Sequence, residues 1–127
     1  MGKKIRVLIV DDNPLDVRLL EILFLKWGYE CFIATNGQQA LDTIDKEKPD
    51  LILMDVLLPD MNGLDISNNL RIKGNNTPIL ILSGMEDRAL DKSNTSLSYM
   101  QKPYTPKDMR TRIELMIKDS KDNQASA

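Results

Sequence analysis

The stretch IRVLIVDD at residues 5–12 decides how this chain is expected to fold. Apart from Arg6, residues 5–10 are apolar and mostly β-branched, and a nearly continuous apolar run is typical of a strand that is covered on both faces. The run ends on two adjacent aspartates, Asp11 and Asp12. We therefore expect a central strand whose carboxyl end carries acidic side chains.

Outward from this strand, segments that favour strands alternate with segments of helical periodicity. Strands are expected at 5–10, 30–34, 51–54, 78–82 and 97–101, and helices at about 14–27, 37–48, 63–73, 85–92 and 106–119. The stripe of the first helix that is expected to face the core consists of Leu15, Leu19, Ile22 and Leu23, widened by Leu20, Phe24 and Trp27. Gly28 is expected to end that helix. The connections between these elements are too short for anything but right-handed crossovers. The alternating order of strands and helices therefore predicts an α/β fold, a doubly wound five-stranded parallel sheet with helices on both faces.

The composition excludes several classes of function. The 127 residues are 42% apolar and 28% charged with a net charge of −2, which describes one compact domain without a broad basic surface for nucleic acid. The chain has no histidine, so Ser-His-Asp triads, Cys-His pairs and His-ligated zinc are excluded. Cys31 is its single cysteine, so no disulfide can form within the chain. Carboxylates, lysine and hydroxyl groups must carry any chemistry.

Two further features bear on location and domain limits. The apolar run after Lys3 and Lys4 is too short for a signal peptide, and no stretch reaches the roughly eighteen apolar residues of a membrane span, so we expect a cytoplasmic protein that does not enter a membrane. The last residues are polar. We expect one domain over 1–119 and a flexible polar tail over 120–127.

Reactive side chains follow four of the expected strands. Asp11 and Asp12 come after the first strand, Asp55 after the third, Ser83 after the fourth and Lys102 after the fifth. In open α/β sheets, ligands bind beyond the carboxyl ends of the strands. A lone aspartate after a strand most often caps a turn or helix, but carboxylates that converge in one crevice repel and either share a proton or bind a cation. Mg²⁺ fits a site with few carboxylates and much water.

Four motifs together resemble one known family. They are IRVLIVDDN at 5–13, DVLLPDMNG at 55–63, ILILSG at 79–84 and YMQKPY at 99–104. In this order the motifs are similar to the receiver domain of bacterial two-component response regulators, the CheY-like domain, over nearly the whole chain. The resemblance implies a flavodoxin-like sheet with strand order 2-1-3-4-5.

The resemblance also implies a phosphoryl-accepting site that holds Mg²⁺. Asp55 resembles the phosphoacceptor, a carboxylate nucleophile that becomes an aspartyl phosphate. Asp12 resembles a direct Mg²⁺ ligand, and Asp11 its neighbour that acts mostly through water. The backbone carbonyl of Leu57 matches the position of the remaining protein ligand, beside Asp55 itself.

Further roles carry over to the later strands. Lys102 matches the lysine that pairs with the acceptor and then with a phosphoryl oxygen, and Ser83 matches the hydroxyl that donates to the phosphoryl group. Pro103 matches a proline whose preceding peptide bond is cis in the family. Tyr99 matches the switch aromatic, which enters space that Ser83 vacates and so changes the face made by the fourth helix, last strand and last helix.

The chain also departs from the family pattern. The span from Ser83 to Lys102 is shorter than usual, and 93–98 replaces the small residues that normally close the fourth helix, so that helix is expected to be short or mobile. Leu57 and Met85 place apolar side chains where the family controls access of water to the phosphoryl group. Because neither can position a hydrolytic water, we expect the phosphorylated form to persist.

The leading hypothesis is a signalling phosphoacceptor rather than an enzyme that turns over a substrate. Its expected partners are a sensor histidine kinase or phosphotransfer protein, a small donor such as acetyl phosphate, and a downstream target or an effector domain of a longer regulator. The alternative is a receiver-like interaction module that phosphorylation does not regulate. Flavodoxins and haloacid-dehalogenase-like phosphatases fit less well, because adjacent Asp11 and Asp12 match neither a flavin-phosphate loop nor the spacing of the phosphatase carboxylates.

Overall fold

One parallel sheet organises the chain. The structure is a computed structural model that describes the backbone of residues 3–84 and 90–125, with side chains as far as residue 121. Within these residues the strands are β1 (Arg6–Val10), β2 (Glu30–Ala34), β3 (Leu51–Asp55), β4 (Ile79–Ser83) and β5 (Ser98–Gln101). Their order is β2-β1-β3-β4-β5, which confirms the predicted doubly wound sheet and the flavodoxin-like order that the resemblance implied. It places β1 between β2 and β3, so that the segment 5–12 is central as expected.

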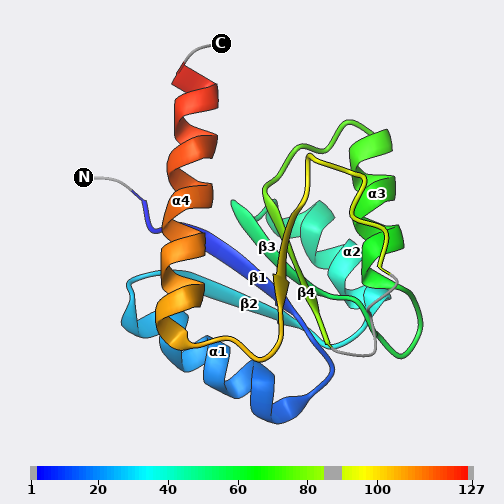
Figure 1. Ribbon diagram of the computed structural model, residues 1–127, viewed down its shortest axis with the longest axis horizontal. Coiled ribbons are helices and arrows are strands. Elements are labelled where there is room, and N and C mark those ends of the chain that lie inside the picture. The colour runs from blue at the N-terminus through cyan, green and yellow to red at the C-terminus, as the bar shows by residue number, and fades with distance from the viewer. Residues whose placement is uncertain (1–2, 85–89, 126–127) are drawn as a thin grey trace.

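Helices cover both faces of this sheet (Figure 1). The described helices are α1 (Pro14–Lys26), α2 (Gly37–Glu47), α3 (Gly63–Ile72) and α4 (Pro106–Ala125). Asparagine side chains cap the first three at Asn13, Asn36 and Asn62 by accepting backbone N–H groups of the first turn. No helix in the described part of the chain is long and apolar enough to cross a membrane.

Alternating strand side chains feed two apolar clusters. Val7 and Ile9 of β1 pack with α1 and α4, whereas Leu8 and Val10 pack with α2 and α3. All four of these side chains are completely buried. Because apolar side chains point to both faces, the central strands read as continuous apolar runs, and the register of β1 against β3 is fixed by burial on both sides.

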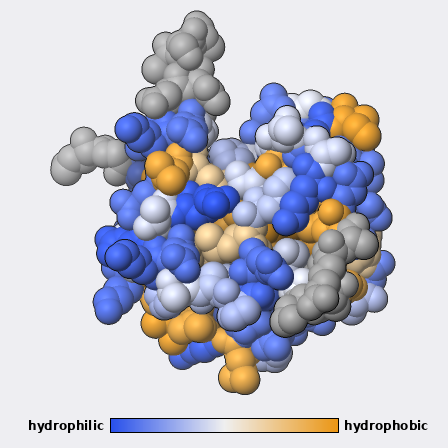
Figure 2. Space-filling view, in the orientation of Figure 1, coloured by the Kyte–Doolittle hydropathy of each residue, from blue (hydrophilic) through white to orange (hydrophobic). Residues whose placement is uncertain are grey.

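The buried side of α1 differs from the predicted stripe. Leu15, Leu19 and Ile22 are exposed, at 82%, 54% and 50% of their surface, while Leu20 and Phe24 are buried. The prediction of the inward face was therefore wrong for those three residues. Apolar residues occupy most of the circumference of α1, so periodicity alone left two overlapping stripes; the structure buries the one with Phe24, whose ring packs against Trp27 and Tyr29 at centroid distances of 5.3 and 5.6 Å. Figure 2 shows the resulting apolar surface along α1.

Other boundaries of α1 agree with the sequence. The helix ends at Lys26, and Gly28 follows with a φ of +94°, a left-handed conformation that glycine adopts without strain. The expected end at Gly28 is confirmed.

The connection from β4 to β5 also differs from expectation. A helix was predicted at 85–92, but Leu90–Lys92 are not helical, and residues 85–89 lie outside the described residues. Side chains of 91–96 bond instead to nearby backbone, as when the Oδ1 of Asn94 accepts the N–H of Ser96 at 3.1 Å, and such bonds compete with helix formation. Polar contacts hold this segment on α3, where Nδ2 of Asn94 donates to Oδ1 of Asn68 at 2.8 Å.

The C-terminal helix is longer than the polar composition suggested. α4 continues to Ala125 and so includes most of the segment 120–127 that was expected to be a tail. No glycine or proline occurs after Pro106, so no residue in this segment breaks the helix. The boundary of the domain at 119 stays a prediction.

Gly63 allows α3 to start directly beside the end of β3. A Cβ atom at this position would collide with the carbonyl oxygen of Asp55, and the N–H of Gly63 donates to the carbonyl oxygen of Val56 at 2.8 Å. The turn after β3 therefore requires a residue without a side chain.

We expect Gly63→Ala to lower the free energy of unfolding by roughly 2–3 kcal/mol, because backbone must move to admit the methyl group. Urea unfolding measures this loss. Gly28→Ala is the control, since a Cβ there meets no atom within 4 Å and only the left-handed backbone opposes it, at about 1 kcal/mol. Equal losses in the two variants would contradict the close approach at Gly63.

Candidate functional site

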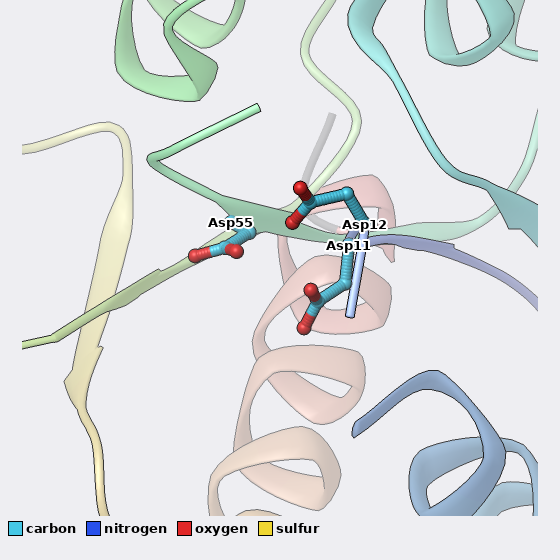
Figure 3. Close-up of side chains that lie close together, drawn as sticks. All are labelled: Asp11, Asp12 and Asp55. Atoms are coloured by element: carbon cyan, nitrogen blue, oxygen red, sulfur yellow. The ribbon is translucent and has the colours of Figure 1, made fainter. Parts of the chain in front are cut away.

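The carboxyl ends of β1 and β3 bring three carboxylates together (Figure 3). Asp11 and Asp12 follow β1, Asp55 ends β3, and one oxygen from each lies within 4.8 Å of the others. Asp55 is more than forty positions from Asp11 and Asp12 in the chain, and the parallel pairing of Val10 with Met54 explains why they meet. The convergence expected from the strand ends is present.

Asp11 is the most buried member of this cluster, with 1% of its surface exposed. Its Oδ1 accepts the N–H of Asn13 at 2.9 Å, whereas its Oδ2 is buried and accepts no hydrogen bond within the described part of the chain. Burial raises the pKa of the Asp11 carboxyl, and the Asn13 bond and the charge of Lys102 offset only part of that rise. An oxygen in this position favours a cation or a proton.

Lys102 provides the positive charge of the site. Its Nζ lies 3.4 Å from Oδ1 of Asp55 and 3.7 Å from Oδ2 of Asp11. Burial on its own would lower the pKa of the Lys102 ammonium, but the surrounding carboxylates outweigh burial and raise it. The backbone N–H of Lys102 donates to the carbonyl oxygen of Ser83 at 2.7 Å, which ties the end of β5 to the end of β4.

Asp55 has an unusually basic carboxylate. Burial is the largest cause, the charge of Lys102 opposes it, and the charge of Asp11 adds to it, so that the pKa of Asp55 rises from 3.8 to about 6. Above pH 6 the group is ionised and carries more negative charge into the pocket than one ammonium can neutralise. Uncompensated negative charge of this kind favours the binding of a cation.

The chemistry of the oxygen atoms fits Mg²⁺. Asp11, Asp12 and Asp55 offer carboxylate oxygens, and the buried Oδ2 of Asp11 accepts no hydrogen bond within the described residues, although Nζ of Lys102 lies 3.7 Å from it. Magnesium prefers such oxygens and retains water in its remaining positions, and Asp12 is exposed enough to admit that water.

The other expected residues lie around this cluster. Ser83 is 4% exposed at the end of β4, the strand that pairs with β3, and the Lys102–Pro103 peptide bond is cis as the resemblance implied. Leu57 lies two residues after Asp55 and is 51% exposed, and an isolated bridge pairs it with Asn62. Met85 lies outside the described residues.

Tyr99 precedes Lys102 by three residues in the chain. It lies on β5, half buried, with its ring against the cluster of α2 and α3. Its hydroxyl donates to the carbonyl oxygen of Asn94 at 3.0 Å, and the carbonyl oxygen of Tyr99 accepts from Nη1 of Arg112 at 3.1 Å. The ring is thus connected to the segment that replaces the expected helix.

Two residues of the site were not predicted. Oδ2 of Asp16 lies 3.8 Å from Nζ of Lys102, a fourth carboxylate supplied by the first turn of α1. Burial, and then the charges of Asp16 and the acidic cluster, raise the pKa of Tyr104 to about 12. An acidic residue in a first helical turn ordinarily only interacts with the helix dipole, so the sequence held no signal for the contact of Asp16.

The comparisons with known proteins agree with this geometry. A family model of the response regulator receiver domain matches residues 7–114. The chain is 35% identical over 123 residues to the alkaline phosphatase synthesis transcriptional regulatory protein PhoP of Bacillus subtilis, covering 94% of this chain and 50% of that protein. It is 32% identical over 123 residues to the DNA-binding response regulator MtrA of Mycolicibacterium smegmatis, covering 94% and 54%.

A solved structure gives the same result. The CheY-like response regulator receiver domain protein from Methanospirillum hungatei superimposes with a TM-score of 0.86 at 25% identity, over 95% of this chain and 99% of that one. The chain belongs to the response regulator receiver domain family of two-component systems. It spans about half the length of the curated relatives it matches, at 50% and 54%. Receiver domains generally bind Mg²⁺ at an acidic pocket, and Asp11, Asp12 and Asp55 form such a pocket here.

The raised pKa of Asp55 predicts how stability depends on pH without metal. The folded state holds a proton on this carboxyl more tightly than the unfolded state, so stability present near pH 4 is lost as pH rises through about 6. Asp55→Asn, measured in EDTA, should remove that loss and unfold with a free energy on the order of 2 kcal/mol higher at pH 7.

Urea unfolding at several pH values tests this. The difference between Asp55→Asn and the wild type should grow from pH 4 to about pH 6.5 and then level off. Asp45→Asn on the exposed face of α2 is the control and should show little change. A difference that shrinks as pH rises would contradict the burial of an ionised Asp55.

Proposed function

We propose that this receiver domain accepts a phosphoryl group on Asp55 in a Mg²⁺-dependent step. The observation that carries the proposal is the buried Asp55 carboxylate, paired with Lys102 and sharing its pocket with Asp11 and Asp12. The donor is a phosphohistidine of a sensor histidine kinase or phosphotransfer protein, because this chain has no histidine of its own, or a small donor such as acetyl phosphate.

The chemistry needs an ionised Asp55. One carboxylate oxygen attacks phosphorus in line and forms a P–O bond, while the P–N bond to the donor imidazole breaks and its electron pair stays on nitrogen. Near pH 7 most Asp55 carboxyls are ionised even with a pKa of about 6. The chain acts here as an acceptor that is itself modified, not as an enzyme that releases a product.

The cation and Lys102 neutralise the charge that gathers in this step. Asp12 would hold Mg²⁺ directly, Asp11 mostly through water, together with Asp55 and the backbone carbonyl of Leu57. When bound, the ion supplies positive charge against the phosphoryl oxygens. The ammonium of Lys102 gives up its contact with the Asp55 carboxylate and pairs with a phosphoryl oxygen instead. The hydroxyl of Ser83 donates a hydrogen bond to another phosphoryl oxygen.

We infer that the output passes through β5 and its neighbours. Movement of Ser83 toward the phosphoryl group opens space for the ring of Tyr99, whose hydroxyl then leaves the carbonyl oxygen of Asn94. The surface that changes is made by the segment 90–97, β5 and α4. Pro103 follows Lys102 at the end of β5 and belongs to the same connection.

The proposed setting is cytoplasmic and the proposed output is a protein contact. The relatives PhoP and MtrA are named as a transcriptional regulatory protein and a DNA-binding response regulator, and this chain matches about half of each. We propose that 1–119 is the receiver domain and that a downstream protein or an effector domain reads its state. With a net charge of −2, the receiver itself does not bind nucleic acid. No observation favours the alternative of an unphosphorylated interaction module.

Intact mass spectrometry after incubation with acetyl phosphate tests the acceptor. We expect one phosphoryl adduct that forms with Mg²⁺, is absent in EDTA and is lost in Asp55→Asn, because Asp55 is the proposed acceptor, with Asp11 and Asp12 beside it and Lys102 at 3.4 Å. Asp45→Asn is the matched control and should be phosphorylated normally. An adduct that survives in Asp55→Asn would refute the assignment, and no adduct with any donor would favour the interaction module.

Lys102→Ala should separate metal binding from phosphorylation. The variant removes the positive charge without removing a ligand oxygen, so we expect Mg²⁺ to bind at least as tightly while phosphorylation slows by about 10²-fold or more. Calorimetry and the mass assay measure the two effects. Phosphorylation at the wild-type rate would contradict the role given to Lys102.

The phosphorylated chain should lose its phosphoryl group slowly. The side chain of Leu57 is apolar and 51% exposed beside Asp55, so it cannot hold a water for attack on phosphorus. We expect the adduct to persist beyond minutes after the donor is removed, and Leu57→Gln, which can bind water, to shorten its lifetime. Decay of the wild-type adduct within seconds, with no phosphatase added, would count against this.

A further inference from the structure

The tip of the loop between β3 and α3 is fastened to a different helix. Asp60 lies exposed in this loop, and its Oδ1 accepts the N–H of Gly37 at 2.7 Å while its Oδ2 accepts the N–H of Gln38 at 3.0 Å. Both N–H groups belong to the first turn of α2, where they have no partner within the helix. A side chain more than twenty positions away therefore caps α2 at two points.

Asn36 caps the same helix from within its own segment. Its Oδ1 accepts the N–H of Gln39 at 2.8 Å. The first turn of α2 is thus satisfied by two side chains of similar chemistry, of which only Asp60 belongs to the β3–α3 loop. Substitutions at Asp60 and at Asn36 can therefore be compared as a matched pair, because both residues cap the same turn and only Asp60 belongs to the loop.

Packing and backbone bonds strengthen the same attachment. A Cβ at Gly37 would lie 2.6 Å from the sulfur of Met61, so the side chain of Met61 fills the space that glycine leaves open. At the other end of the loop, Leu57 pairs with Asn62 in an isolated bridge. The loop is closed across its base and held at its tip.

The attachment matters because the loop contains the carbonyl of Leu57. A backbone carbonyl can be placed only by the path of the chain, and the exposed side chain of Leu57 adds little packing to fix that path. The two bonds of Asp60 lie three residues further along the same loop. They restrict where the carbonyl can lie relative to Asp55.

We propose that Asp60 is a positioning residue for the Mg²⁺ site, because its two-point cap on α2 fixes the β3–α3 loop and with it the carbonyl of Leu57. This inference rests on the proposed function, which places that carbonyl among the metal ligands. Asp60 itself touches neither the metal nor the phosphoryl group. Groups that orient metal ligands typically change metal affinity by about 10–100-fold when removed.

Thermodynamic linkage between the cap and Mg²⁺ binding gives a second prediction, which can be measured without phosphorylating the protein. If the cap of Asp60 strengthens Mg²⁺ binding, then Mg²⁺ binding must strengthen the cap by the same factor. The backbone amides of Gly37 and Gln38 should therefore exchange hydrogen more slowly when Mg²⁺ is present. The amide of Gln39, which Asn36 holds, should respond less.

The experiment compares Asp60→Ala with Asn36→Ala. Each variant removes one capping side chain from the same helical turn, but only Asp60→Ala releases the loop. We expect Asp60→Ala to weaken Mg²⁺ binding by about tenfold in calorimetry, and Asn36→Ala by less than about twofold. Asp60→Asn, which keeps an accepting oxygen, should restore part of the affinity. Amide exchange of Gly37 and Gln38 is measured by NMR with and without Mg²⁺ in the wild type.

The outcomes separate this inference from the proposed function. Equal Mg²⁺ affinities in Asp60→Ala and Asn36→Ala, with normal binding by the wild type, would overturn the role of Asp60 alone. Unchanged exchange at Gly37 and Gln38 on Mg²⁺ binding would overturn it as well, even if the variants were poorly folded. Failure of the wild type to bind Mg²⁺ or to accept a phosphoryl group would instead overturn the proposed function.

Discussion

The ammonium of Lys102 lies against carboxylates from β1, β3 and α1, and the rest of the site depends on this contact. One positive charge makes the burial of Asp11 and Asp55 tolerable but leaves negative charge uncompensated, and burial first, with the neighbouring carboxylates adding to it, raises the pKa of both carboxyls. A divalent cation removes that excess, and a phosphoryl group adds new negative charge that the same cation and Lys102 can neutralise. The buried carboxylates therefore lower the stability of the folded state at the site where the cation and the phosphoryl group are proposed to bind.

The sheet makes this contact possible, and the sequence predicts the sheet well. Apolar runs covered on both faces leave little choice of register, so strands placed by composition alone carry Asp11, Asp55 and Lys102 to one edge. The sequence is less informative where a helix is apolar around most of its circumference, because its buried face cannot then be read from periodicity. The buried face of α1 was predicted wrongly because packing of Phe24 with Trp27 and Tyr29, and not periodicity, selects between two stripes.

Two kinds of feature could not be predicted from the sequence: the structure of segments that lack an apolar pattern, and contacts between residues far apart in the chain. The residues Leu90–Lys92 were expected in a helix, yet local side-chain bonds and contacts with α3 hold the following residues in irregular backbone. Asp16 and Asp60 act through partners far away in sequence, on Lys102 and on the start of α2. Asp16 lies in an ordinary first helical turn, and Asp60 lies within the motif at 55–63, but in neither case does the local sequence indicate the distant partner, which only the structure reveals.

The most direct measurement of the central claim is an NMR titration with Mn²⁺, which takes the same oxygen ligands as Mg²⁺ and broadens the signals of nearby nuclei. One saturable ion should broaden the amides that follow β1 and β3, at Asp11, Asp12 and residues 55–57, before any others, and excess Mg²⁺ should restore them. Broadening that spreads over exposed acidic residues such as Asp42 and Asp45, without saturation, would contradict a single pocket formed by carboxylates from separate strands.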